Sequence, residues 1–145
     1  MKIETKIKKW GIKQWKAEAW KFFSIWTRLK YSDKNGYVYC YTCGKRMFWK
    51  NDGAQAGHFN QGRRNSILLN EKEVRPQCYE CNYYYYGKQH EFGERLRKEI
   101  GEEEFKKVKQ QKHKTVKFTK KYWMEKANYY QREAVKLAFD KNLII

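Results

Sequence analysis

The spacing of the cysteines constrains this 145-residue chain more than any other feature. The four cysteines form two C-x-x-C pairs with 34 residues between them, Cys40 with Cys43 and Cys78 with Cys81. Each pair lets two thiolates bind one metal ion from a tight turn, and two such turns complete a tetrahedral shell. We therefore predict a closed, structural zinc site with four cysteine ligands, and the alternative is two separate redox pairs.

The residue after each cysteine pair bears on how the two turns are built. Such a residue often needs a left-handed backbone, because the chain changes direction there. Gly44 adopts that backbone without steric cost, and Asn82, at the second turn, belongs to the next best residue type. We therefore expect a left-handed residue at both positions.

Nothing in the sequence predicts export. The basic segment Met1–Trp10 is followed by no apolar core or small-residue cleavage site, so we expect no signal peptide. No stretch approaches the roughly 18 apolar residues that a membrane helix needs. We expect a cytoplasmic protein with no membrane partner, and in a reducing compartment paired cysteines are more often zinc ligands than disulfides.

Positive charge is concentrated at the two ends of the chain. Residues 1–30 hold nine Lys and Arg against two acids, and residues 105–145 hold twelve against three. The centre is nearly neutral, although the whole chain carries a net charge of +17. This charge predicts an anionic partner, most simply nucleic acid. The aromatic content of 18% argues against a disordered chain.

Apolar residues at helical spacing predict amphipathic helices in both basic ends and after the second cysteine pair. In the first end they are Ile12, Trp15, Ala19, Phe22, Trp26 and Leu29. In the last end they are Trp123, Ala127, Tyr130, Ala134 and Leu137. A further helix carries Phe92, Leu96 and Ile100, is interrupted at Gly101, and resumes through Phe105 and Val108. Residues 110–119 form a polar connector.

Short β signals lie around the cysteines. We expect strands at 37–39, 46–50, 56–59 and 73–77, with a helix beginning near Tyr79. The central unit is so small that the metal, rather than an apolar core, has to hold it together. The predicted fold class is α+β, a mostly helical chain around a small ββα module that a four-cysteine zinc site stabilises. We expect a single domain with three parts, which are the basic N-terminal helix (1–33), the zinc-stabilised ββα module (34–101) and the basic C-terminal helices (102–145).

His58 is the only histidine between the two cysteine pairs. If the ββα element closes on itself, His58 and Asn82 face each other across a small gap. A neutral imidazole accepts a proton from water, and an amide oxygen ligates a hard cation such as Mg²⁺. Arg63 and Arg64, in the loop after His58, are candidate DNA phosphate contacts. The plainer interpretations are a polar loop residue for His58 and a turn residue for Asn82.

An ordered set of motifs resembles the lambda NinG (Rap) family of phage recombination endonucleases. The resemblance covers roughly residues 18–101 and includes the segment 22–33. The remaining motifs are Cys40–Cys43, Gly57-His58-Phe59, Gln77-Cys78–Cys81-Asn82 and Gly87…Glu91-Phe92…Leu96…Ile100-Gly101. The layout also resembles the HNH (His-Me finger) nuclease module and is similar to phage endonuclease VII. The family implies a structure-specific endonuclease acting on branched DNA such as Holliday junctions and D-loops.

The resemblance also implies roles for individual residues. His58 matches the general base, and Asn82 matches the ligand of a catalytic Mg²⁺ or Mn²⁺. The four cysteines match structural zinc ligands. The implied chemistry is phosphodiester hydrolysis that leaves 5′-phosphate and 3′-hydroxyl ends. A homodimer is expected, because symmetric cutting of two strands needs two active sites.

Two positions depart from the HNH pattern. HNH nucleases commonly have an Asp metal ligand directly before the base histidine, whereas this chain has Gly57 there. A second protein ligand therefore has to come from Glu73, Glu91, Asp52 or Glu71, or else phosphate and water complete the coordination shell of the metal. HNH nucleases usually also have an Asn that orients the histidine. We expect it near position 73, where this chain has Glu73 instead. Glu73 either orients His58 through a hydrogen bond or ligates the metal, and both alternatives stay open.

Three functions are carried forward from the sequence. The first is the metal-dependent junction endonuclease with His58 as base. The second is a non-catalytic zinc module that binds nucleic acid or a recombination partner, and the third is an HNH nicking or packaging nuclease. The consecutive tyrosines Tyr83–Tyr86 either stack on unpaired bases or pack against the N-terminal helix.

Overall fold

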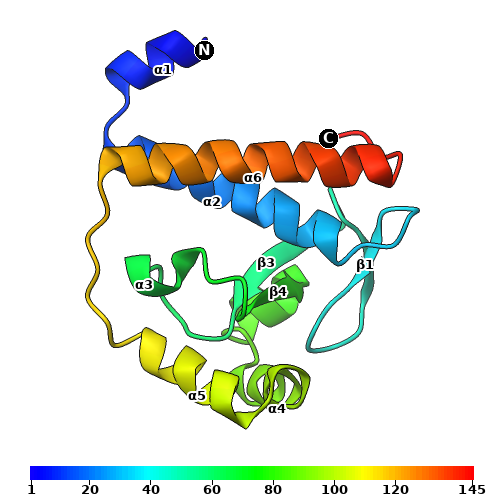
Figure 1. Cartoon of the computed structure of the whole chain (residues 1–145). Helices are drawn as coiled ribbons and strands as arrows, with labels where there is room; N and C mark the ends of the chain where they lie inside the picture. Colours follow the sequence, from blue (N-terminus) through cyan, green and yellow to red (C-terminus); the bar gives the residue numbers. More distant parts are fainter.

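The computed structural model describes all 145 residues and has the mixed helix and strand composition that the sequence predicted. Figure 1 shows two long helices lying over two small sheets, with two shorter helices on the opposite side. The helices are α1 (Ile3–Lys9), α2 (Ile12–Lys30), α3 (Asn65–Leu68), α4 (Gln89–Ile100), α5 (Glu102–Gln111) and α6 (Lys120–Asp140). A one-turn π-helix, η1, covers Glu80–Tyr84, and the strands are β1 (Tyr37–Tyr39), β2 (Arg46–Phe48), β3 (Gln55–His58) and β4 (Val74–Gln77).

Helices α2 and α6 make the most extensive contact in the molecule and lie side by side (Figure 1). Trp15 packs with Trp123 at one end of the pair, and Leu29 packs with Ala138 at the other, so the two helices run in the same direction. A fully buried alanine on each helix, Ala19 and Ala134, contributes little bulk to the contact. This layer is therefore held together by apolar packing.

The helical periodicity predicted the position of α2 correctly but assigned part of its buried face wrongly. Phe23 is fully buried, whereas Phe22 is only half-buried and Ile12 is exposed. Steps of four residues lead from Trp15 through Ala19 to Phe23, and these positions share one face of a helix. The N-terminal arm is also divided, because α1 and α2 are separated at Trp10 and Gly11.

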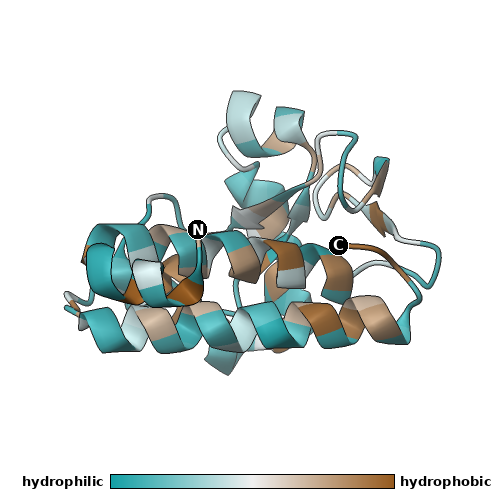
Figure 2. Cartoon of the chain, turned by 90° about the horizontal axis from the view of Figure 1, so that it is seen from above, coloured by the Kyte–Doolittle hydropathy of each residue, from teal (hydrophilic) through white to brown (hydrophobic).

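The helices are amphipathic rather than uniformly apolar. Figure 2 shows hydrophilic and hydrophobic segments alternating along them. None of them combines the length and the apolar character that crossing a bilayer requires.

Each strand pairs with one antiparallel partner, so the molecule has two two-stranded sheets. Val38 of β1 lies opposite Met47 of β2 in the hairpin that carries the first cysteine pair. In the second sheet Gly57 lies opposite Arg75 and His58 opposite Val74. Strand β3 ends at His58, so the loop that follows begins directly at this side chain.

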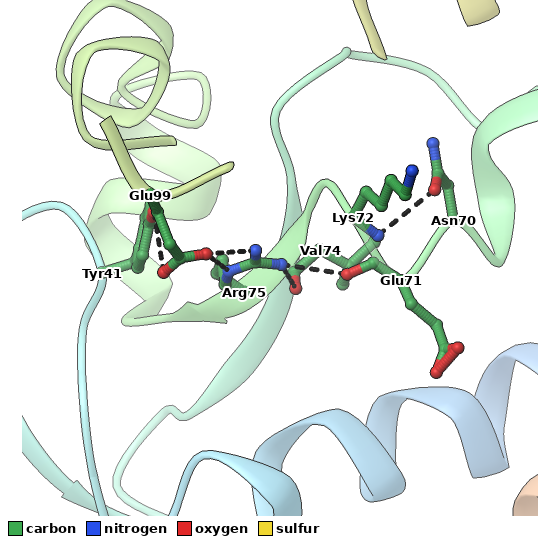
Figure 3. Close-up of polar contacts among 7 residues, drawn as sticks. All are labelled: Tyr41, Asn70, Glu71, Lys72, Val74, Arg75 and Glu99. Carbon is green, nitrogen blue, oxygen red and sulfur yellow. Dashed lines mark hydrogen bonds and ion pairs between the residues drawn. The ribbon is translucent and has the colours of Figure 1, made fainter. Parts of the chain in front are cut away.

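A buried arginine connects β4 to α4 (Figure 3). Arg75 Nε donates to Glu99 Oε2 at 3.0 Å, and its Nη1 donates to the carbonyl oxygens of Glu71 at 3.0 Å and Val74 at 2.9 Å. Tyr41 Oη donates to the other oxygen of the Glu99 carboxylate at 3.3 Å. Because its donors are used inside the protein, Arg75 has a structural role.

The helix predicted to begin near Tyr79 is a single π-helical turn. It ends because Tyr86, Gly87 and Lys88 follow it with left-handed backbones, at φ 52°, 83° and 49°. An α-helix does not pass through three such residues, so α4 begins only at Gln89. π-Helical turns are rare and often occur at functional sites.

Candidate functional site

The four cysteines form a compact cluster of sulfur atoms. All four Sγ atoms lie within 4.8 Å of one another, and the Sγ atoms of Cys43 and Cys78 are 3.7 Å apart. Four thiolates at about 2.3 Å from one tetrahedral zinc ion would be roughly 3.8 Å apart, so the donor set fits zinc. The predicted grouping of both pairs around one centre is therefore confirmed as a site that can hold a metal ion such as zinc.

The two cysteine turns differ in their backbones. Gly44 closes the first turn with φ 79° and donates its N–H to the carbonyl of Cys40 at 2.9 Å, as predicted. The prediction of a left-handed Asn82 is wrong. Asn82 lies inside η1 and donates its N–H to the carbonyl of Cys78 at 3.0 Å, because the chain passes from the second turn directly into a helical turn. A special backbone conformation therefore does not account for asparagine at this position.

His58 and Asn82 line one cavity of about 470 Å³. The long loop after β3 and the turn η1 supply the walls of this cavity. The other residues that line it are Asn60, Gln61, Gly62, Arg63, Tyr83, Tyr84, Tyr86 and Gly87. The fold thus brings together His58, Asn82 and Arg63, three of the residues that the sequence singled out.

The orientation of the His58 ring is set by a backbone carbonyl. Nε2 of His58 lies 2.9 Å from the carbonyl oxygen of Leu68. A carbonyl oxygen only accepts hydrogen bonds, so Nε2 carries the proton and Nδ1 keeps a free lone pair. Burial, with a smaller contribution from the charge of Arg63, lowers the pKa of His58 below its ordinary value, against the opposing effect of the Leu68 carbonyl. The ring is consequently neutral at pH 7 and able to accept a proton.

Trp20 of α2 is a site residue that the sequence reasoning missed. Its ring stacks on His58 with centroids 5.1 Å apart and an interplanar angle of 21°. The guanidinium of the exposed Arg63 lies 5.2 Å from the centroid of the same Trp20 ring. No local spacing could reveal this contact, because it joins a helix near the N-terminus to the loop after β3.

Asn82 is held by a neighbouring amide. Its Nδ2 donates to Gln55 Oε1 at 2.7 Å, which orients the Asn82 amide. A Cβ atom added to Gly57 would lie 3.1 Å from Asn82 Oδ1 but only 1.9 Å from Oε1 of the buried Gln77. The Gln77 side chain therefore occupies the space that an aspartate at position 57 would need.

Glu73 forms hydrogen bonds with two asparagines and not with His58, contrary to one of its two predicted roles. Asn60 donates to the Glu73 carboxylate from its backbone N and its Nδ2, both at 2.9 Å, and Asn70 Nδ2 donates at 3.3 Å. Burial raises the pKa of Glu73 to about 7, against the opposing effect of these donors. Glu73 thus fixes the start of the loop after β3, while the Leu68 carbonyl orients His58.

None of the other predicted carboxylate ligands lines the cavity. Asp52 accepts a hydrogen bond from the backbone N of Phe48 at 3.0 Å in the first hairpin. The side chains of Glu71 and Glu91 are exposed and lie outside the cavity. Among the predicted ligands, only Asn82 therefore reaches the cavity. Mg²⁺ is usually bound by one or two carboxylates together with substrate phosphates. The residues of this cavity thus fit such a cation only when phosphate oxygens complete its shell.

A protein-family model described as "Bacteriophage Lambda NinG protein" matches residues 2–139, which is nearly the whole chain. The matched range includes both cysteine pairs, His58, Asn82, all of α2 and all but the last residue of α6. No curated protein matches the chain, and no solved structure does.

Proposed function

This chain belongs to the bacteriophage Lambda NinG family, and we propose that it is a metal-dependent, structure-specific DNA endonuclease. Family membership relates it to phage recombination. The proposed substrates are branched DNA molecules such as Holliday junctions and D-loops. The observation that carries the proposal is the orientation of His58, whose free Nδ1 belongs to a neutral ring in the same cavity as Asn82 and Arg63.

In the proposed reaction, His58 Nδ1 accepts a proton from a water molecule, and the resulting hydroxide attacks the phosphorus atom. The P–O3′ bond breaks, and the departing 3′-oxygen takes a proton from solvent water, which leaves a 5′-phosphate and a 3′-hydroxyl. Arg63 neutralises charge on the phosphate oxygens. A Mg²⁺ or Mn²⁺ ion held by Asn82 and by phosphate oxygens would stabilise the charge that develops.

The cysteine cluster would help to position the residues of the cavity. Cys81 directly precedes Asn82, so a zinc ion at the four cysteines would fix the position of the amide in the cavity. In this proposal β3, β4 and η1 serve as the ββα element of an HNH nuclease. In this proposal zinc is structural and is not a reactant.

Several basic residues near the cavity are available for DNA. The carbonyl of Arg63 accepts a hydrogen bond from Lys16 Nζ at 3.3 Å, and Arg64 Nη1 donates to the carbonyl of Lys112 at 3.2 Å. These contacts hold the side chains of Lys16 and Arg64 against the backbone of two other basic residues, one in the loop after β3 and one directly after α5. None of these four cations forms an ion pair with an acid. Free cations of this kind bind DNA phosphates without sequence preference.

One observation favours a second candidate function. The cavity has no carboxylate, whereas catalytic Mg²⁺ sites usually have one or two. A zinc module that binds branched DNA or a recombination partner without cutting it would need no carboxylate in the cavity.

The third function carried forward from the sequence, a nicking or packaging nuclease, would cut linear duplex as readily as a junction.

A cleavage assay separates these functions. A labelled four-way junction and a linear duplex of the same sequence would be incubated with the zinc-loaded protein and Mg²⁺ or Mn²⁺. We expect junction cleavage by the wild type, none by His58→Ala, and wild-type cleavage by His90→Ala, because His90 is exposed and lies outside the cavity. Junction binding without cleavage in either metal would favour the non-catalytic module, and equal cleavage of both DNAs would favour the nicking enzyme. A proposed homodimer would be tested separately by light scattering.

A further inference from the structure

The rim of the His58 cavity carries aromatic surface that packing does not explain. Tyr83, Tyr84 and Tyr86 line the cavity and are 63%, 63% and 77% exposed. These side chains are not buried against the N-terminal helix, which was one of the two sequence-based interpretations of the tyrosine run. Large aromatic side chains usually contribute to stability through burial, so three exposed rings around one cavity indicate a binding surface.

The rings of Tyr83 and Tyr84 are ordered by neighbouring rings rather than by the core. Tyr83 stacks on Tyr79 with centroids 5.3 Å apart and an interplanar angle of 10°. Tyr84 meets both rings edge-on, at 5.6 Å from Tyr79 and 5.5 Å from Tyr83. A platform whose rings are already oriented loses less conformational entropy when a flat ligand stacks on it.

The backbone at the rim is also held in an unusual conformation. Tyr86 has a left-handed backbone at φ 52°, which is rare for a bulky residue. Its carbonyl accepts a hydrogen bond from Gln61 Nε2, and Gln77 Nε2 donates to the carbonyl of Gly87 at 3.0 Å. These contacts hold Tyr86 on the rim in a strained geometry of the kind that clusters at binding sites.

The chemistry of the cavity identifies a ligand for this surface. Tyr83 directly follows Asn82, so a phosphate held near Asn82 and Arg63 would place its attached nucleoside against the tyrosine rings. Paired bases in a duplex are stacked between their neighbours and do not present a face. Unpaired bases do, and aromatic side chains bind them without sequence preference.

We propose that Tyr83, Tyr84 and Tyr86 form a stacking site for an unpaired base next to the phosphate bound at His58 and Asn82. The preferred DNA then has unpaired or unstacked bases beside the bound phosphate, as at a branch point. This inference rests on the proposed function for the identity of the polymer, because it specifies which part of the DNA the cavity selects.

The test measures binding separately from cleavage. The zinc-loaded 145-residue chain would be titrated, without Mg²⁺ or Mn²⁺, into DNA that carries 2-aminopurine either unpaired at a branch or paired within a duplex. We expect the fluorescence of the unpaired probe to be quenched by stacking and that of the paired probe to change little. Tyr83→Leu/Tyr84→Leu should bind the branched DNA about 10- to 100-fold more weakly and lose the quenching, with duplex affinity changed less than about twofold.

Two controls keep the result interpretable. Tyr129→Leu removes another exposed tyrosine, 43% exposed on α6 and outside the cavity, and should bind as the wild type does. Tyr83→Phe/Tyr84→Phe keeps both rings and should bind and quench as the wild type does, and the retained duplex affinity of the leucine variant would show that it is folded. Equal losses for branched and duplex DNA, or unchanged quenching in the leucine variant, would overturn the stacking site. Cleavage without base-dependent quenching would reject this inference alone, whereas quenching without cleavage would reject only the nuclease function.

Discussion

The α2–α6 layer and the cysteine-bearing centre of the molecule differ in how far polar contacts supplement their apolar packing. In the layer, buried tryptophans such as Trp15 and Trp123 pack around alanines. In the centre, the strands have only three or four residues, and their apolar packing against α2 and α6 is supplemented by the cysteine cluster, the Arg75–Glu99 pair and the Glu73–Asn60 hydrogen bonds. The centre that carries the cavity therefore combines apolar contacts with the helical layer, buried polar contacts, and a cysteine cluster that can hold a metal ion.

The largest effect is expected when the metal is removed. Structural zinc contributes about 10–16 kcal/mol to the folded state of zinc-finger peptides, so Cys78→Ser or zinc chelation should unfold the centre. The N-terminal parts of α2 and α6 pack around Trp15 and Trp123 in a cluster without cysteines, and we expect most of the helical circular dichroism to remain. The fluorescence of Trp49, which packs beside the cysteines, should report the loss of the centre. If the removal of zinc abolished the whole helical circular dichroism signal together with the packing of Trp49, the two regions would unfold as one cooperative unit, contrary to this prediction.

The next largest effect is expected at Arg75. Arg75→Ala leaves the carboxylate of Glu99 and two carbonyls without their donor, and we expect the free energy of unfolding to fall by about 3 kcal/mol. Arg97→Ala is the matched control, because Arg97 pairs with Glu94 and Glu102 on the surface and should matter little. Urea denaturation of both variants gives the comparison. Equal losses would contradict the structural role assigned to burial.

Glu73→Gln should have a smaller effect. The substitution places an amide N–H₂ group among the donors of Asn60 and Asn70, and we expect a loss of about 1–3 kcal/mol in unfolding free energy. Because Glu73 does not contact His58, the pH dependence of cleavage should stay unchanged. A shifted pH–rate profile at unchanged stability would instead support Glu73 as the residue that orients the base.

The sequence predicted the helices, the strands around the cysteines and the metal cluster, because each depends on local spacing. Helical periodicity positions α2, and two C-x-x-C pairs readily bind one ion. The sequence did not predict α3, because its four residues are too few for a periodic pattern. It also missed the contact between Trp20 and His58 and the partners of Glu73, which join segments far apart in the chain. Such contacts depend on how the elements pack, and no local pattern encodes that.

The smallest of the expected effects concerns pH. Burial lowers the pKa of His58, so its neutral form should persist below the ordinary histidine value of about 6.5. Cleavage in single-turnover experiments should be independent of pH above that value and fall only at lower pH, as the ring becomes protonated. Trp20→Leu removes the stacked ring that covers His58 and should move the midpoint upward toward 6.5. A midpoint above 6.5 in the wild type would contradict a buried, neutral base.

The central claim is that His58 acts as the base of a DNA endonuclease, and chemical rescue tests it most directly. His58→Gly would be assayed on a four-way junction with Mg²⁺ or Mn²⁺, with and without added imidazole, after confirming that zinc content and junction binding are retained. We predict that the wild type cleaves, that the variant does not, and that imidazole restores cleavage in proportion to its unprotonated form. A wild type that binds but never cuts, or a variant that cuts at the wild-type rate without imidazole, would contradict the account.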